Sequence, residues 1–343
     1  MPLPPSGLGC AAQSRESAEP LCGTAPTATA GWLLIEHSGP WPGYGYPPDL
    51  PAPLAAAADW LLRFGVRPQL IRRTDRVGRR GDGVRAIFLV GGADDGVDGA
   101  EGAGVAGGTG GTGHGIAGGA GHGVAGRWIE RVDPELLTDR QALRRLGPDT
   151  FRSPRRPGLG RSQGPLLLVC THGRREVCCA RYGRPVAVAL VARFGSAVWE
   201  TTHVGGDRFA ANLVLLPGGA YFGRLDPDHA VKVAELALGG ELDLDAYRGT
   251  AGRSEAAQSA EWHLRRALDE PRIGAVRALP PHPADAAHPH RFARGHERYS
   301  VIVEPYTYPD PRLLSCAEGV VQPPRGHRLV SITVEPPPVT SGG

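Results

Sequence analysis

The sequence lacks several features that define large protein classes. Methionine occurs once and lysine is almost absent, so the 38 basic residues are nearly all arginine and are balanced by 35 acidic residues. No run approaches the roughly 20 apolar residues that a membrane-spanning helix needs. No basic stripe with interleaved aromatic residues is present, although nucleic-acid-binding surfaces usually have one. We therefore expect a protein whose partners include neither a membrane nor a nucleic acid.

Cysteine is also too scarce for a disulfide-based fold, with six residues among 343. Clustered cysteines in a reducing compartment more often bind metal or carry out redox chemistry. The opening Met1-Pro-Leu-Pro-Pro-Ser has no basic segment followed by an apolar one, so we expect a cytoplasmic protein. Cys10, Cys22 and Cys316 stand alone in the sequence, and we expect them to be ordinary thiols.

The first part of the chain, residues 1–146, predicts an N-terminal α/β domain. Short apolar runs predict strands, and an alanine- and leucine-rich segment predicts a helix between the first two. The segment 99–126 is half glycine, but it lacks the strand, helix and Lys-Ser/Thr ending of a phosphate-binding loop. We interpret it as a disordered insertion. The predicted strands are at 32–36, 69–72, 85–90 and 128–132, and the helix is at 54–64.

The rest of the chain divides into four parts. Residues 147–164 predict a linker, and residues 165–250 predict the order strand, helix, strand, strand, strand, helix, which is typical of a thioredoxin-like fold. Residues 251–335 predict a helix and a β-hairpin, and residues 336–343 a disordered tail. The predicted fold class is therefore α/β (α+β), with an α/β N-terminal half, a thioredoxin-like C-terminal half and a small C-terminal β extension. No internal sequence repeat is convincing.

The most informative stretch contains three of the six cysteines, Cys170, Cys178 and Cys179, with His203 in a loop downstream. Cys170 ends an apolar run and Cys179 begins a predicted helix. A helix N-terminus lowers the pKa of a thiol and favours a bound anion. Adjacent helical residues point about 100° apart, so only one of the neighbours Cys178 and Cys179 should face such a site. This pattern predicts a metal or redox site.

Two longer motifs contain these residues: Cys170-x-His172-Gly-Arg-Arg-Glu-x-Cys178-Cys179-Ala and Val198-Trp-Glu-x-x-His203-x-Gly-Gly-x-Arg208-Phe-Ala-Ala-Asn212. Together with Glu19-Pro-Leu-x-Gly-Thr-Ala-Pro26 they resemble the sucrase/ferredoxin-like family over most of residues 10–225. The resemblance implies a thioredoxin-like protein that carries a [2Fe-2S] cluster.

The resemblance also implies a set of ligands. In ferredoxin-type members a C-x8-C pair and an H-x3-H pair bind the cluster, and Cys170 and Cys179 have the first spacing. His203 occupies the first histidine position, whereas Asp207 replaces the second. We therefore predict Cys170, Cys179, His203 and Asp207 as cofactor and metal ligands, with Cys178 as an alternative. A carboxylate ligand adds negative charge and lowers the reduction potential, or else Asp207 leaves the cluster labile or absent.

The leading hypothesis is a ferredoxin-like electron-transfer protein, a carrier without catalytic residues whose partner is a reductase or an electron acceptor. One alternative is a metal-free thioredoxin-like thiol redox protein that uses Cys178 or Cys179, although no C-x-x-C is present. The other is a zinc site on Cys170, Cys179, His203 and Asp207, which is a plausible tetrahedral set. We find no paired carboxylates on which to base sugar hydrolysis.

Overall fold

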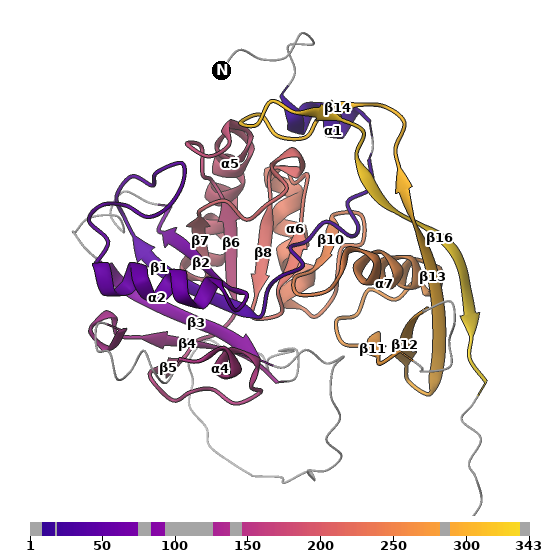
Figure 1. Ribbon diagram of the computed structural model, residues 1–343, viewed down its shortest axis with the longest axis horizontal. Helices are drawn as coiled ribbons and strands as arrows, with labels where there is room; N and C mark the ends of the chain where they lie inside the picture. The colour runs from indigo at the N-terminus through magenta and orange to yellow at the C-terminus, as the bar shows by residue number, and fades with distance from the viewer. Residues whose placement is uncertain are drawn as a thin grey trace, which may run out of the picture.

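The computed structural model describes residues 9–17, 19–74, 84–92, 126–137, 146–281 and 289–336 (Figure 1). The predicted insertion 99–126 lies outside the described residues except for Gly126, and so does nearly all of the predicted tail. The mixed α/β class is confirmed, because a ten-stranded mixed sheet is accompanied by a separate four-stranded antiparallel sheet. The thioredoxin-like label and the division into domains remain predictions.

The first half of the chain forms a strand–helix–strand unit followed by two antiparallel strands, which we call the first unit. β1 pairs in parallel with β2 and antiparallel with β3, which pairs antiparallel with β4. Every residue of β1 is buried, as expected for a central strand covered on both faces. The elements are β1 (Gly31–His37), α2 (Ala52–Leu62), β2 (Val66–Arg72), β3 (Val84–Gly92) and β4 (Arg127–Val132).

The predicted linker 147–164 contains a short helix, α4 (Pro148–Arg152), and a two-residue strand, β5 (Arg161–Ser162), which pairs with β4. Phe151 of α4 is fully buried in the core of the first unit. This segment therefore packs onto the sheet.

The second half repeats the same arrangement, and we call it the second unit. β6 pairs in parallel with β7 and antiparallel with β8, which pairs antiparallel with β9. Asp226 caps the following helix, since its carboxylate accepts a hydrogen bond from the His229 N–H at 2.8 Å. The elements are β6 (Leu166–Cys170), α5 (Val177–Phe194), β7 (Val198–Thr201), β8 (Leu213–Leu216), β9 (Ala220–Phe222), α6 (Pro227–Leu238) and an added edge strand, β10 (Tyr247–Thr250).

The two units have equivalent strand orders, β2-β1-β3-β4 and β7-β6-β8-β9. They join edge to edge where β2 pairs antiparallel with β7, through only two residue pairs, Ile71 with Thr201 and Arg72 with Glu200. The carboxyl ends of the two strands therefore overlap. As a result the first part of β2 extends past the end of β7, beside the loop that contains His203.

One hydrophobic cluster belongs to both units. Trp32, Phe88 and Trp199 are among its members, and the rings of Phe88 and Trp199 lie 5.6 Å apart. Their strands, β3 and β7, are three steps apart in the sheet, which would separate them by about 14 Å if the sheet were flat. The sheet therefore curls around this shared core.

A third part of the structure follows the two units in sequence. Helix α7 (Glu255–Leu268) packs on the four-stranded sheet, in which β13 and β16 form an antiparallel pair within the predicted β extension. A two-stranded sheet of β14 and β15 lies beside the N-terminal helix α1 (Figure 1). The elements are α1 (Cys10–Glu16), β11 (Arg277–Leu279), β12 (His290–Arg294), β13 (Glu297–Thr307), β14 (Arg312–Leu313), β15 (Val321–Gln322) and β16 (Arg325–Val334).

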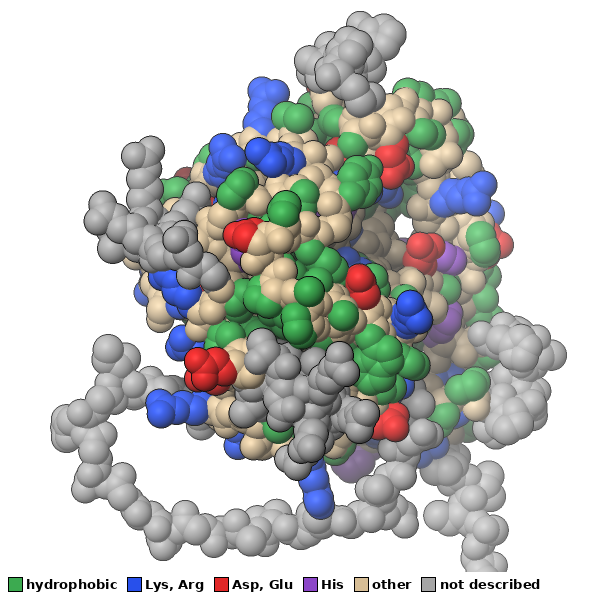
Figure 2. Space-filling view, turned by 60° about the vertical axis from the view of Figure 1, so that its left-hand side comes forward, with side chains coloured by type: hydrophobic (Ala, Val, Ile, Leu, Met, Phe, Trp, Pro, Cys, Tyr) green, Lys and Arg blue, Asp and Glu red, His purple; other side chains and the backbone are tan. Residues whose placement is uncertain are grey.

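The surface agrees with the balanced composition. On the face shown in Figure 2, basic and acidic side chains are interspersed among apolar ones. Within the described residues, none of the helices combines the length and the apolar character that crossing a membrane would require.

The joint between the units contains a buried ion pair that we expect to be essential for stability. The Arg72 side chain donates two hydrogen bonds to one oxygen of Glu200, at 3.0 and 2.9 Å, and the Glu200 side chain is only 3% exposed. Arg72→Met would remove the cation that donates both of these hydrogen bonds to a buried carboxylate, and should cost about 3 kcal/mol of unfolding free energy in urea denaturation. The matched control is Arg193→Met, whose exposed pair with Glu235 should contribute less than about 1 kcal/mol. Equal losses for the two variants would contradict this account of the joint.

Candidate metal centre

Cys170 and Cys179 meet where a buried strand passes into a helix. Cys170 is the last residue of β6 and Cys179 is the third residue of α5, and both are 1% exposed. The helix can approach the strand end because residue 183 is glycine. A Cβ atom there would lie 2.1 Å from the carbonyl oxygen of Cys170. The C-x8-C spacing thus places both thiols on one side of this junction.

His203 completes a compact group with these two cysteines. The Sγ atoms of Cys170 and Cys179 and a ring nitrogen of His203 all lie within 4.8 Å of one another. The Sγ of Cys179 is 3.7 Å from Nδ1 of His203. The structure therefore brings together three of the four predicted ligands.

Burial and hydrogen bonding shift the pKa values of the three side chains in different directions. A hydrogen bond from the Cys179 thiol, assisted by His203, holds the pKa of Cys170 well below its usual value, although burial opposes this. Donating that hydrogen bond, together with burial, raises the pKa of Cys179. Burial disfavours the charged form of His203, but its hydrogen bond with Cys170 outweighs this and raises the His203 pKa. We expected the helix N-terminus to lower the pKa of Cys179, but the lowered pKa is that of the strand cysteine, Cys170.

His172 positions the histidine loop and has no nitrogen left for a metal. Its Nδ1 accepts the backbone N–H of His203 at 3.2 Å, and its Nε2 lies 2.7 Å from the carbonyl oxygen of Pro42. These contacts require a neutral ring with its proton on Nε2. Burial supports this state by lowering the pKa of His172. The Pro42 contact comes from the first unit, so both units hold the loop in place.

Arg248, a buried arginine that the sequence did not reveal as part of the site, holds the same loop through hydrogen bonds. Arg248 donates from Nη1 to the carbonyl oxygen of Gly205 at 3.0 Å and to Oδ1 of Asn212 at 2.8 Å. Asn212 in turn donates to the carbonyl oxygen of Gly206 at 2.9 Å. Gly206 has φ = 70°, and a Cβ there would lie 2.3 Å from Nη2 of Arg248. Arg208, by contrast, pairs with Glu19 at 2.7 Å.

Asp207, the fourth predicted ligand, lies beside this group and outside it. It begins a short 3-10 turn, Asp207–Phe209, and is 7% exposed. Its Oδ2 accepts a contact from the Sγ of Cys10 at 3.4 Å. Burial raises the pKa of this carboxyl group, while the nearby His203 works in the opposite direction. Asp207 is thus close enough to influence His203, but its direct contact is with a different cysteine.

Cys178 also points elsewhere, into a second group of three thiols. Its Sγ lies 3.5 Å from that of Cys10 and 3.5 Å from that of Cys316. Cys10 and Cys316, which stand alone in the sequence and which we expected to be ordinary thiols, therefore lie together in space. Nothing in the sequence signals this, because 306 residues separate the two. Cys22 is buried outside both groups.

Comparison with known proteins agrees with the geometry. Residues 126–249 match the sucrase/ferredoxin-like family model. This segment is a sucrase/ferredoxin-like domain. It covers about a third of the chain and contains β4, β5, all but the last residue of the second unit, and all four predicted ligands. The N-terminal motif at 19–26 lies outside the matched segment. No protein with a curated description and no solved structure gives a significant match.

The donor set fits an iron–sulfur cluster or a single metal ion. Cluster iron binds thiolates and accepts imidazole in their place. Zinc takes the same donors in a tetrahedron. Two buried thiols, one already favouring its anion, and an imidazole held by its neighbours therefore form a suitable site. A cluster would be held by Cys170, Cys179 and His203.

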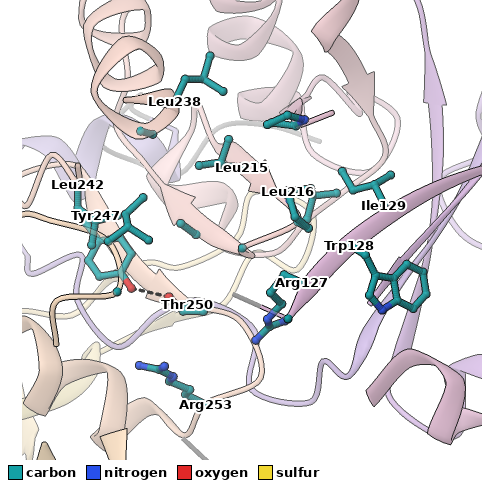
Figure 3. A pocket seen from close by; sticks show the side chains of 18 of the residues that line it. Arg127, Trp128, Ile129, Leu215, Leu216, Leu238, Leu242, Tyr247, Thr250 and Arg253 are labelled. Carbon is teal, nitrogen blue, oxygen red and sulfur yellow. Dashed lines mark hydrogen bonds between the residues drawn. The ribbon is translucent and has the colours of Figure 1, made fainter. Parts of the chain in front are cut away.

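A separate cavity of about 590 Å³ lies away from both cysteine groups (Figure 3). Aliphatic side chains such as Leu215 and Leu216 line one side, and Arg127 and Arg253 point toward it. Tyr247 hydrogen-bonds Thr250 at its edge, at 2.6 Å. None of the cysteines lines this cavity, so it is not part of the metal centre.

The close approach at Gly183 gives a direct test of how the centre is built. Gly183→Ala should gain about 1 kcal/mol in helix propensity but lose more by overpacking against the Cys170 carbonyl, with a net destabilisation of about 1–2 kcal/mol. It should also reduce metal retention, because α5 must move away from β6. Gly164→Ala is the matched control, since a Cβ there meets nothing within 4 Å. Urea denaturation and metal analysis of both variants check this, and unchanged values for Gly183→Ala would contradict the proposed packing.

Proposed function

We propose that this protein is a ferredoxin-like one-electron carrier whose second unit holds a [2Fe-2S] cluster on Cys170, Cys179 and His203. The observation that supports this most strongly is the donor set, two thiols and one imidazole grouped inside the segment that matches the family. When bound, the cluster would supply reversible one-electron transfer. The residues around it would hold it and tune its charge.

Each residue has a distinct part in this proposal. Cys170 and Cys179 would bind as thiolates, so binding would release their thiol protons. His203 would bind through Nδ1, the nitrogen nearest Cys179. His172 would act as a positioning residue, because it fixes the backbone of His203. Arg248 is 1% exposed and contacts the loop as a buried cation, which would offset part of the negative charge of the two thiolates.

We further propose that only three protein side chains bind the cluster. Asp207 stands at the position where the family pattern has a second histidine, but its carboxylate contacts Cys10. An oxidised [2Fe-2S] core carries a charge of about +2, so two thiolates and a neutral imidazole give a neutral site. A nearby carboxylate that is not a ligand would still lower the reduction potential, because it disfavours the added electron.

A redox partner protein would approach on the His203 side. An opening of about 160 Å³ is lined by both histidines of the loop region, His172 and His203, and by Tyr44 and Arg175. Tyr44 is 72% exposed, and the Arg175 guanidinium lies 4.0 Å above its ring. Aromatic residues and arginine are enriched at protein interfaces. The first unit would serve as the scaffold that carries this docking surface.

A zinc ion at the same three residues is the second candidate. The compactness of the group favours it, because a single tetrahedral ion places thiolate and imidazole donors about 3.6 Å apart, close to the observed 3.7 Å. The thiol redox alternative has less support, since Cys178 and Cys179 belong to different groups. Iron, sulfide and zinc contents separate these candidates.

The test is the metal content of anaerobically purified protein. We expect two iron atoms and two acid-labile sulfides per chain, with visible absorption that bleaches on dithionite reduction. Cys170→Ser and Cys179→Ser should each lose most of the iron, because each removes one of three protein ligands. Cys22→Ser is the matched control and should retain it, since Cys22 is buried outside both groups. Protein that holds no iron after purification and reconstitution would overturn the proposal.

A further inference from the structure

The three thiols of Cys10, Cys178 and Cys316 form a closed triangle. The Cys10–Cys178 and Cys178–Cys316 Sγ distances are 3.5 Å, and the Cys10–Cys316 distance is 3.3 Å. They come from the start of α1, the start of α5 and the loop between β14 and β15. Cys10 and Cys178 are buried, whereas Cys316 is partly exposed and offers a route from solvent.

The surrounding contacts hold each cysteine in place. The side chain of Glu176 accepts a hydrogen bond from the Ser315 hydroxyl at 2.6 Å and one from the Ala317 N–H at 3.2 Å, so the loop bearing Cys316 is fixed to the start of α5. The Cys10 N–H donates to the Sγ of Cys316 at 3.3 Å. Residue 9 is glycine, and a Cβ there would lie only 3.3 Å from the Sγ of Cys178.

The dimensions of the triangle match a single tetrahedral ion. With metal–sulfur bonds of 2.3 Å, tetrahedral thiolates lie about 3.8 Å apart, a little more than the observed separations. A disulfide needs about 2.0 Å, and three thiols cannot all pair. Thiolates on different irons of a four-iron cluster would stand much further apart. The contact between Cys10 Sγ and Asp207 Oδ2, at 3.4 Å, places a carboxylate next to the triangle.

We propose that Cys10, Cys178 and Cys316 bind a structural zinc ion, with Asp207 as the fourth ligand. Thiolate donors select zinc, copper(I) or iron–sulfur clusters, and a carboxylate in the set favours zinc over copper(I). Binding releases the thiol protons to solvent and involves no oxidation. This site is separate from the proposed cluster, although the adjacent residues Cys178 and Cys179 link the two.

The ion would join both ends of the described chain to the second unit. Residues 10, 178 and 316 lie 168 and 138 positions apart, so the bonds close two long loops. Closing long loops removes conformational freedom from the unfolded chain and stabilises the folded one. Removal of zinc should therefore loosen α1 and the β14–β15 loop first, and both should become sensitive to limited proteolysis.

The test measures zinc and iron in the same full-length samples, grown with added zinc and passed over a chelating resin. Wild type and the control Cys22→Ser should each retain one zinc ion per chain. Cys316→Ser should lose the zinc and keep its iron, whereas Cys170→Ser should lose iron and keep zinc. Asp207→Asn should weaken zinc binding by at least about tenfold while iron content stays unchanged.

Two results would overturn the proposal. One is wild-type protein with no more zinc than Cys316→Ser, and the other is zinc that disappears with Cys170→Ser. If Cys316→Ser does not fold, cobalt(II) titration of the full-length Cys170→Ser/Cys179→Ser variant gives an independent answer. A thiolate-to-cobalt charge-transfer band that zinc abolishes supports the site, and absence of the band refutes it. Because iron is measured separately, failure of the zinc site and failure of the electron-carrier proposal remain distinguishable.

Discussion

The buried ion pair between Glu200 and Arg72 is the interaction on which the rest of this structure depends. The Glu200 carboxylate lies on β7 at the joint between the units, where Arg72 of the first unit donates two hydrogen bonds to it. Thr171, the residue between Cys170 and His172, donates to the same oxygen at 2.8 Å. One buried charge thus joins the two halves of the sheet and fixes the start of the loop that follows the strand cysteine. Because the pair is buried, loss of either partner would be costly.

The two units share one topology but have different side chains at the end of their first strand. The first strand of the second unit ends at Cys170, whereas the first strand of the first unit ends at His37, which pairs with Asp49 at 3.1 Å. The helix that follows begins with Ala52-Pro-Leu in the first unit and with Val177-Cys-Cys in the second. The group of Cys170, Cys179 and His203 therefore lies in the second unit. The first unit contributes Arg72 and the Pro42 contact that orients the loop with His203.

The sequence predicted what depends on local pattern. Apolar runs located most strands, and the short path from β6 into α5 explains why C-x8-C spacing identified Cys170 and Cys179. The features that the sequence could not predict depend on contacts between residues that are far apart in the chain. Cys10 meets Cys316 across 306 residues, and Arg248 reaches the histidine loop from an edge strand that was not predicted. The fusion of both units into one sheet rests on two residue pairs, too few to leave a sequence signal.

The central claim is that His203 and two cysteines hold a redox-active cluster. Pulsed EPR of the dithionite-reduced protein with ¹⁵N-labelled histidine tests this most directly. We predict a [2Fe-2S] signal with strong coupling to the nitrogen of one histidine, which disappears in His203→Ala and persists in His229→Ala, a surface histidine paired with Asp243. A signal without histidine coupling, or iron-containing protein without any paramagnetic signal after reduction, would contradict the account.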